Sequence, residues 1–260
     1  MYGESPSMLD MVLPVAFWPL LVAIPLWLLA RLWQPRLFPF VVALAMAVAV
    51  AGLHGAWQPW PRQALDWLFW ASILPALAWL LRPGVPAQVL AWLVAMVAVG
   101  WPLWQRHPSM LVGLAIATVL VLLVQSAWRY LATQPGHEMG LLGAQVLLVL
   151  TNVLGGSVLA GQLSGALLAV SGVLWLLPLA WREAPHLAEP VSRISLTLLM
   201  LLAAYTYWYV DVPWLQVLVA LVLPLLGAWL LRKHWLAAGL SWLASLCLML
   251  WWLWPEGPMY

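Results

Sequence analysis

Long runs of apolar residues, interrupted by short clusters of charged residues, proline and glycine, occupy most of the sequence. A helix needs about 20 apolar residues to cross a hydrocarbon core of about 30 Å, and about 17 is the lower limit. Ten runs meet this length, and we expect each to be a transmembrane helix: 11–30, 37–53, 64–81, 85–104, 110–128, 139–160, 165–181, 194–210, 214–231 and 235–254. The sequence therefore predicts an all-α polytopic integral membrane bundle of about ten transmembrane helices, forming a single transmembrane domain over residues 1–260 without a soluble domain.

Charged residues are too few to cover a surface that faces water. They make up 7% of the chain, whereas about a quarter is usual for a soluble protein. Ten scattered Lys and Arg residues cannot build the basic patch that nucleic-acid binding requires. The single cysteine, Cys247, excludes an intrachain disulfide, and the five histidines form no cluster with ligand spacing. We expect the lipid bilayer as the surroundings, with no nucleic-acid partner and no metal or other cofactor.

The cations alternate between the predicted loops. Only Arg62 and Arg106 fall in one set of alternate loops, and the other set holds Arg31, Arg36, Arg82, Arg129, Arg182, Arg193, Arg232 and Lys233. Cytoplasmic loops carry an excess of Lys and Arg, so the larger set is predicted to face the cytoplasm. The sequence thus predicts a bacterial-type cytoplasmic (inner) membrane, with both termini outside.

Neutral polar and aromatic side chains supply a candidate cavity. Asn152 and Gln145 lie deep in the sixth run, and Ser157 follows in the glycine-rich stretch 155–165. That stretch is either a tight outer turn or a broken helix that lines a cavity, and the frequency of glycine in loops favours the turn. Trp92 and Trp175, two of the 22 tryptophans, fall near the middle of their runs, where the indole N–H needs a partner. The alternative to a cavity is that these side chains only join and pack helices.

A second candidate site is a polar rim at the outer ends of the runs, formed by His54, Arg62, Asp66, Arg106 and His107. Asp66 is the one acidic residue inside a run, and it lies four residues after Arg62 on the same helical face. An interfacial ion pair at this spacing is the favoured interpretation, and a proton-coupling carboxylate is the alternative.

The chain contains a weak internal repeat. The stretch 85–90, VPAQVL, is similar to 212–218, VPWLQVL, with one inserted residue. The match pairs the fourth and fifth runs with the ninth and tenth. Because an odd number of crossings inverts the second copy, it suggests a 5+5 inverted repeat with halves 11–130 and 139–254, an arrangement found in many secondary carriers.

Three classes of function remain open. The favoured one is a carrier that moves a small uncharged, amphipathic or organic-cation solute through an aromatic, neutral-polar cavity. The second is a non-catalytic accessory or assembly subunit of a larger membrane protein complex, and a homodimer is a further possible assembly. The weakest is a membrane enzyme acting on a lipid-linked substrate, because that chemistry calls for carboxylates, histidines or basic phosphate clamps gathered at one membrane face.

Overall fold

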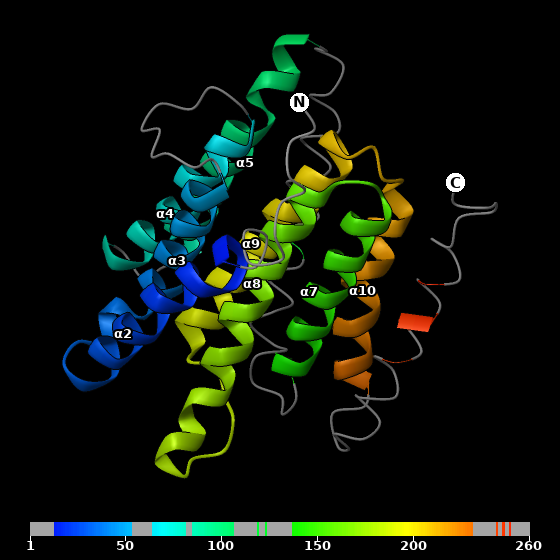
Figure 1. Cartoon of the computed structure of the whole chain (residues 1–260). Coiled ribbons are helices and arrows are strands. Elements are labelled where there is room, and N and C mark those ends of the chain that lie inside the picture. The colour runs from blue at the N-terminus through cyan, green and yellow to red at the C-terminus, as the bar shows by residue number, and fades with distance from the viewer. Residues whose placement is uncertain are drawn as a thin grey trace, which may run out of the picture. The chain divides into compact units, whose positions relative to one another are not determined.

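The computed structural model describes residues 13–53, 64–81, 85–106 and 137–230, together with the single residues 119, 123, 243, 246, 247 and 250. Within these segments the chain is helical and forms no strand (Figure 1). The α-helices are α2 (Trp18–Leu32), α3 (Phe38–Leu53), α4 (Ala64–Leu81), α5 (Val85–Arg106), α7 (His137–Leu154), α8 (Val158–Leu176), α9 (Glu189–Tyr209) and α10 (Trp214–Leu230). Three short turns of other helix types accompany them: η1 (Leu13–Phe17), η2 (Pro35–Leu37) and η3 (Leu177–Trp181).

Each of these eight α-helices corresponds to one of the ten predicted spans, and α4 matches its span 64–81 at both ends. The other two spans, 110–128 and 235–254, fall almost wholly outside the described residues, so the count of ten stays a prediction. Within the described segments, five helical stretches are long and apolar enough to cross a membrane: Val15–Leu32, Pro35–Leu53, His137–Leu154, Val158–Trp181 and Glu189–Tyr209. These apolar helices indicate a membrane protein.

The boundary between the sixth and seventh predicted spans lies elsewhere than the sequence suggested. We expected helices over 139–160 and 165–181, but α7 ends at Leu154 and α8 begins at Val158. Most of the glycine-rich stretch 155–165 is therefore helical, and the connection is a turn of three residues. Length and composition alone placed this boundary too late, because glycine occurs both in turns and inside closely packed helices.

The turn is a Schellman motif, the hydrogen-bonded ending that glycine commonly gives to a helix. The Ser157 N–H donates to the Asn152 carbonyl at 2.9 Å, and the Gly156 N–H donates to the Val153 carbonyl at 3.1 Å. Gly156 has a φ of 87°, a left-handed conformation that glycine adopts without steric cost. Gly161 then lets α8 pass close to α7, because a Cβ atom there would lie 2.6 Å from Cγ2 of Val153.

The chain divides into two compact units. Unit 1 comprises residues 1–99 and 165–195, and unit 2 comprises residues 100–164 and 196–260. The divisions fall inside α5, α8 and α9, so the units alternate along the chain and differ from the halves 11–130 and 139–254 of the predicted repeat. The inverted repeat stays a prediction.

In unit 1, α3 packs against both α2 and α4 (Figure 1). Its buried residues are mostly alanine and valine, and small side chains allow membrane helices to approach one another closely. The Ser72 hydroxyl of α4 donates to the Ala43 carbonyl of α3 at 3.2 Å. A second interhelical bond joins the Ser171 and Ser195 hydroxyls, 3.2 Å apart. These hydrogen bonds between uncharged groups join α4 to α3 and α8 to α9 within unit 1.

In unit 2, α7 packs along α10 (Figure 1). Leu147 of α7 and Ala220 of α10 are fully buried at this contact, with Leu150 and Val219 packed against them. This apolar contact holds α7, the helix that carries Asn152, against α10.

Candidate functional site

Asn152 lies where three helical segments of unit 2 meet. Its side chain is fully buried. Its Nδ2 donates to the Ser164 hydroxyl of α8 at 3.0 Å, and its Oδ1 accepts from the Thr206 hydroxyl of α9 at 2.8 Å. The Thr206 hydroxyl also lies 2.8 Å from the Leu202 carbonyl, so its one proton is shared between two acceptors. Both ends of the Asn152 amide are thus engaged inside the protein.

The other predicted cavity residues have separate surroundings. The Ser157 hydroxyl caps α8, where it accepts from the Ala160 N–H at 3.3 Å. Gln145 is fully buried in α7. Trp92 and Trp175 belong to unit 1, whereas Asn152, Ser157 and Gln145 belong to unit 2. The cavity itself stays a prediction.

Trp92 is buried, and its indole N–H has no hydrogen-bond partner among the described residues. Trp175 is half-buried on α8.

The predicted outer rim falls largely outside the described residues. His54, Arg62 and His107 lie there, and Arg106 is the last residue of α5. Asp66 is buried in the first turn of α4. The Asp66–Arg62 ion pair and the rim as a whole stay predictions.

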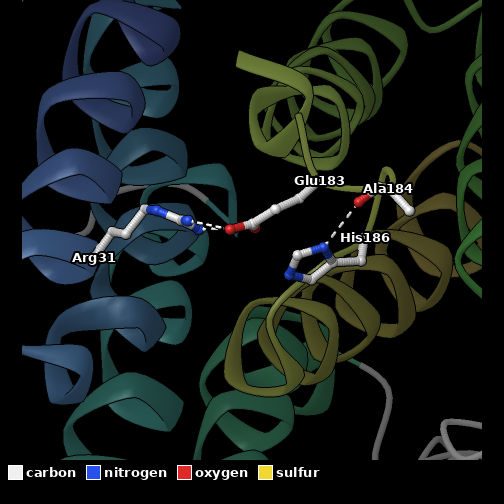
Figure 2. A network of polar contacts seen from close by, with 4 residues as sticks. All are labelled: Arg31, Glu183, Ala184 and His186. Atoms are coloured by element: carbon white, nitrogen blue, oxygen red, sulfur yellow. Dashed lines mark hydrogen bonds and ion pairs between the residues drawn. The ribbon is translucent and has the colours of Figure 1, made fainter. Parts of the chain in front are cut away.

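A charged site appears in unit 1 that the sequence did not predict. Arg31, in the last turn of α2, donates two hydrogen bonds to the carboxylate of Glu183, 152 residues further along (Figure 2). The Nη1–Oε2 distance is 3.2 Å and the Nη2–Oε1 distance is 2.5 Å. The pair is two-pronged, which is the strongest arrangement for a guanidinium and a carboxylate. Both side chains are partly exposed, by 26% for Arg31 and 42% for Glu183.

Two tryptophans lie beside the same guanidinium. The carbon Cζ of Arg31 lies 5.4 Å from the ring centroid of Trp27 and 4.9 Å from that of Trp181. The two indole rings are 5.2 Å apart and inclined by 47°. Distances of this size place the cation within reach of the electron-rich faces of both rings. We call Trp27, Trp181 and Glu183 the aromatic–carboxylate cage.

The sequence builds this cage from two local patterns. Trp27 precedes Arg31 by four residues, so both side chains lie on the same face of α2. At the other segment, α8 tightens into η3 around Pro178, and Arg182, the residue that caps the end of η3, has a φ of 60°. A left-handed residue reverses the chain immediately before Glu183, although it costs a non-glycine residue about 1 kcal/mol. The strained turn presents Glu183 to α2.

The Arg31 guanidinium holds the pKa of the Glu183 carboxyl below its ordinary value, because its hydrogen bonds favour the charged form. His186, three residues after Glu183, bonds the Ala184 carbonyl through Nδ1 at 3.0 Å (Figure 2). Because its pKa is lowered, the Glu183 carboxylate is ionised at neutral pH and can pair with a cation.

A related contact lies on the first turn of α9. Arg193 pairs with Glu189 four residues earlier, and its guanidinium lies over the Trp79 ring at 5.4 Å. All the cations in these contacts belong to the larger, predicted cytoplasmic set. Tryptophan and arginine residues near the ends of apolar runs were the available sequence signal for these cation–aromatic contacts. No pattern in the sequence links positions 31 and 183.

Among the described residues, no group of three or more His, Cys, Asp and Glu side chains is arranged to hold a metal ion. No family model matches the chain, and neither a curated protein nor a solved structure is significantly similar to it.

Proposed function

We propose that this chain is a membrane carrier for a small uncharged, amphipathic or organic-cation solute. We further propose that the Arg31–Glu183 pair is a latch that opens and closes one end of unit 1. The observation that carries the proposal is this partly exposed ion pair, which joins two distant segments where apolar helices end. The carrier sits in a cytoplasmic-type membrane, with the latch on the cytoplasmic side and both termini outside.

To act as a latch, the Arg31–Glu183 ion pair must separate at a moderate cost in free energy. Removing one partner of a buried ion pair is expensive because it leaves an uncompensated charge in the protein interior. Arg31 and Glu183 both keep contact with the surroundings, so each can be hydrated after the pair separates. Partly exposed pairs of this kind contribute little to stability, and they are suited to reversible contacts.

The polar groups inside unit 2 suit a solute without a fixed anionic charge. Asn152, Ser164 and Thr206 are neutral, and each can exchange its present hydrogen bond for one to a solute or water. In the open state, Asn152, Gln145 and Ser157 border the cavity through which the solute passes. In the structure described above, the Asn152 amide is instead satisfied by the Ser164 and Thr206 hydroxyls, and the Ser157 hydroxyl accepts from the Ala160 N–H.

The proposal is tested by counterflow into proteoliposomes that contain the purified full-length chain. Radiolabelled tetraethylammonium represents organic cations, and radiolabelled thymidine represents uncharged amphipathic solutes. We expect saturable, protein-dependent accumulation of at least one of them, altered by Arg31→Gln and by Glu183→Gln. The control is Arg36→Gln, because Arg36 is exposed near the end of α2 and forms no ion pair with any described residue. Absence of protein-dependent flux for both solutes would overturn the proposal as stated.

A second candidate function is the accessory or assembly subunit of a larger membrane complex. The full engagement and complete burial of the Asn152 amide favour it, because a tightly packed helix joint requires no solute. Native mass spectrometry after mild detergent extraction distinguishes the two functions. A lone chain or homodimer supports the carrier, whereas foreign subunits in fixed stoichiometry support the accessory subunit.

A further inference from the structure

We infer that the aromatic–carboxylate cage of Trp27, Trp181 and Glu183 is a binding site for an organic cation, and that Arg31 occupies it as an internal ligand in the state described. This inference rests on the proposed carrier function and narrows its solute to the organic cations. It concerns residues of unit 1 alone.

The cage has the composition that recognises a cation with delocalised or alkyl-shielded charge. Two indole rings supply electron-rich faces, 5.2 Å apart and inclined to one another. One carboxylate supplies the compensating negative charge. Aromatic faces attract a weakly hydrated cation, such as a quaternary ammonium or guanidinium group, because it loses little hydration on binding.

The position of Arg31 shows that a cation fits the cage. Its guanidinium contacts all three residues of the cage at once: the Trp27 ring at 5.4 Å, the Trp181 ring at 4.9 Å and the Glu183 carboxylate through two hydrogen bonds. Trp181 and Glu183 are both substantially exposed, so a solute can reach the cage from outside the helices. Trp27 is only 3% exposed and forms the inner wall.

Arg31 can leave the cage without vacating α2. It lies in the last turn of that helix, and a long flexible side chain at such a position can turn toward the surroundings. An organic cation would take its place beside the two indoles and keep Glu183 neutralised. Solute binding and opening of the latch would then be one event, because the solute replaces the cation that joins α2 to the segment after α8.

Binding of radiolabelled tetramethylammonium to the purified full-length protein in detergent tests the inference. Arg31→Ala removes the internal ligand, and we expect it to bind tetramethylammonium about tenfold more tightly than the unmodified chain does. The double variants Arg31→Ala/Trp181→Leu and Arg31→Ala/Glu183→Gln should lose that gain. Arg36→Ala removes an exposed cation near the end of the same helix, and it should bind as the unmodified chain does.

Thermal unfolding checks that each variant is folded. If Arg31→Ala is not folded, Arg31→Leu replaces it, because leucine preserves apolar volume beside Trp27. Unchanged affinity in a folded Arg31 variant would overturn the inference, and so would a gain that survives both double variants.

The same measurements separate this inference from the carrier function. Flux of tetraethylammonium or thymidine without binding at the cage would overturn the inference and leave the carrier in place. Binding at the cage without flux of either solute would support the cation site and contradict the carrier.

Discussion

Asn152 has two hydrogen-bonding ends, and each is used by a different helix. Its partners are hydroxyl groups of Ser164 on α8 and Thr206 on α9. The neighbouring Thr151 is equally buried, but its hydroxyl donates to the Leu147 carbonyl of its own helix. Two adjacent polar residues therefore have different roles, which a pattern of polar letters along the sequence cannot distinguish.

This difference predicts unequal costs of substitution. Asn152→Leu removes two interhelical hydrogen bonds, and we expect it to lower the free energy of unfolding by about 1–2 kcal/mol. Thr151→Val, the matched control, removes one bond within a helix and should cost less. Equilibrium unfolding in mixed micelles with increasing SDS measures both. Equal costs for the two variants would show that Asn152 does not join the helices.

Glu183 gives a pH dependence with a definite sign. Because Arg31 lowers the pKa of Glu183, the ion pair stabilises the fold above the ordinary glutamate pKa, 4.5, and that contribution is lost as the pH falls through the still lower pKa of the folded state. The difference in melting temperature between the unmodified chain and Glu183→Gln should stay constant from about pH 7 to about pH 5. It should shrink only below that range. A decline that is complete between pH 7 and pH 6 would contradict the assigned partner.

Among the helices, the join between α7 and α8 shows what apolar periodicity can and cannot predict. Length and composition located both helices, because crossing a bilayer needs about 20 apolar residues. They did not locate the turn, because Gly156 ends a helix whereas Gly161 permits close contact inside one. Only the three-dimensional neighbours of each glycine separate these two uses.

Two glycines of α8 provide a matched comparison. A Cβ atom at Gly161 would lie 2.6 Å from Val153 Cγ2, whereas one at Gly172 would meet nothing within 4 Å. We expect Gly161→Ala to destabilise the protein by about 1–3 kcal/mol through overpacking. Gly172→Ala should be neutral or stabilise it by up to about 1 kcal/mol, because alanine is the better helix former. The SDS unfolding measurement applies to both, and a neutral Gly161→Ala would refute the close approach of α7 and α8.

For the molecule as a whole, the sequence predicted the all-helical membrane class and most helix positions, but not the charged site. Apolar length is a local property, so eight of the ten spans have a matching helix in the described residues. The contact between Arg31 and Glu183 depends on how segments 152 residues apart fold together. A single sequence carries no local signal for such a contact.

The predicted orientation of the molecule in the membrane can be tested by labelling cysteines. The excess of cations predicts that the segment around His186 lies in the cytoplasm, and that the connection containing Asp211, at the other end of α9, lies outside. In a Cys247→Ser background, His186→Cys should be protected from a membrane-impermeant thiol reagent added to intact cells. Asp211→Cys should react. Reaction of His186→Cys together with protection of Asp211→Cys would show that the topology is the inverse of the predicted one.

The most direct test of the carrier account holds the latch closed while leaving the cage intact. Cysteines replace the exposed residues Leu32 and Ala184, which adjoin Arg31 and Glu183, in a Cys247→Ser background. Flexible thiol cross-linkers that can be cleaved by reduction join them, and solute counterflow is measured in proteoliposomes before and after reduction. If the latch must open during transport, cross-linking abolishes the flux and reduction restores it. Flux that continues unchanged in fully cross-linked protein would contradict the account, because the end of α2 would then have no need to separate from the segment around Glu183.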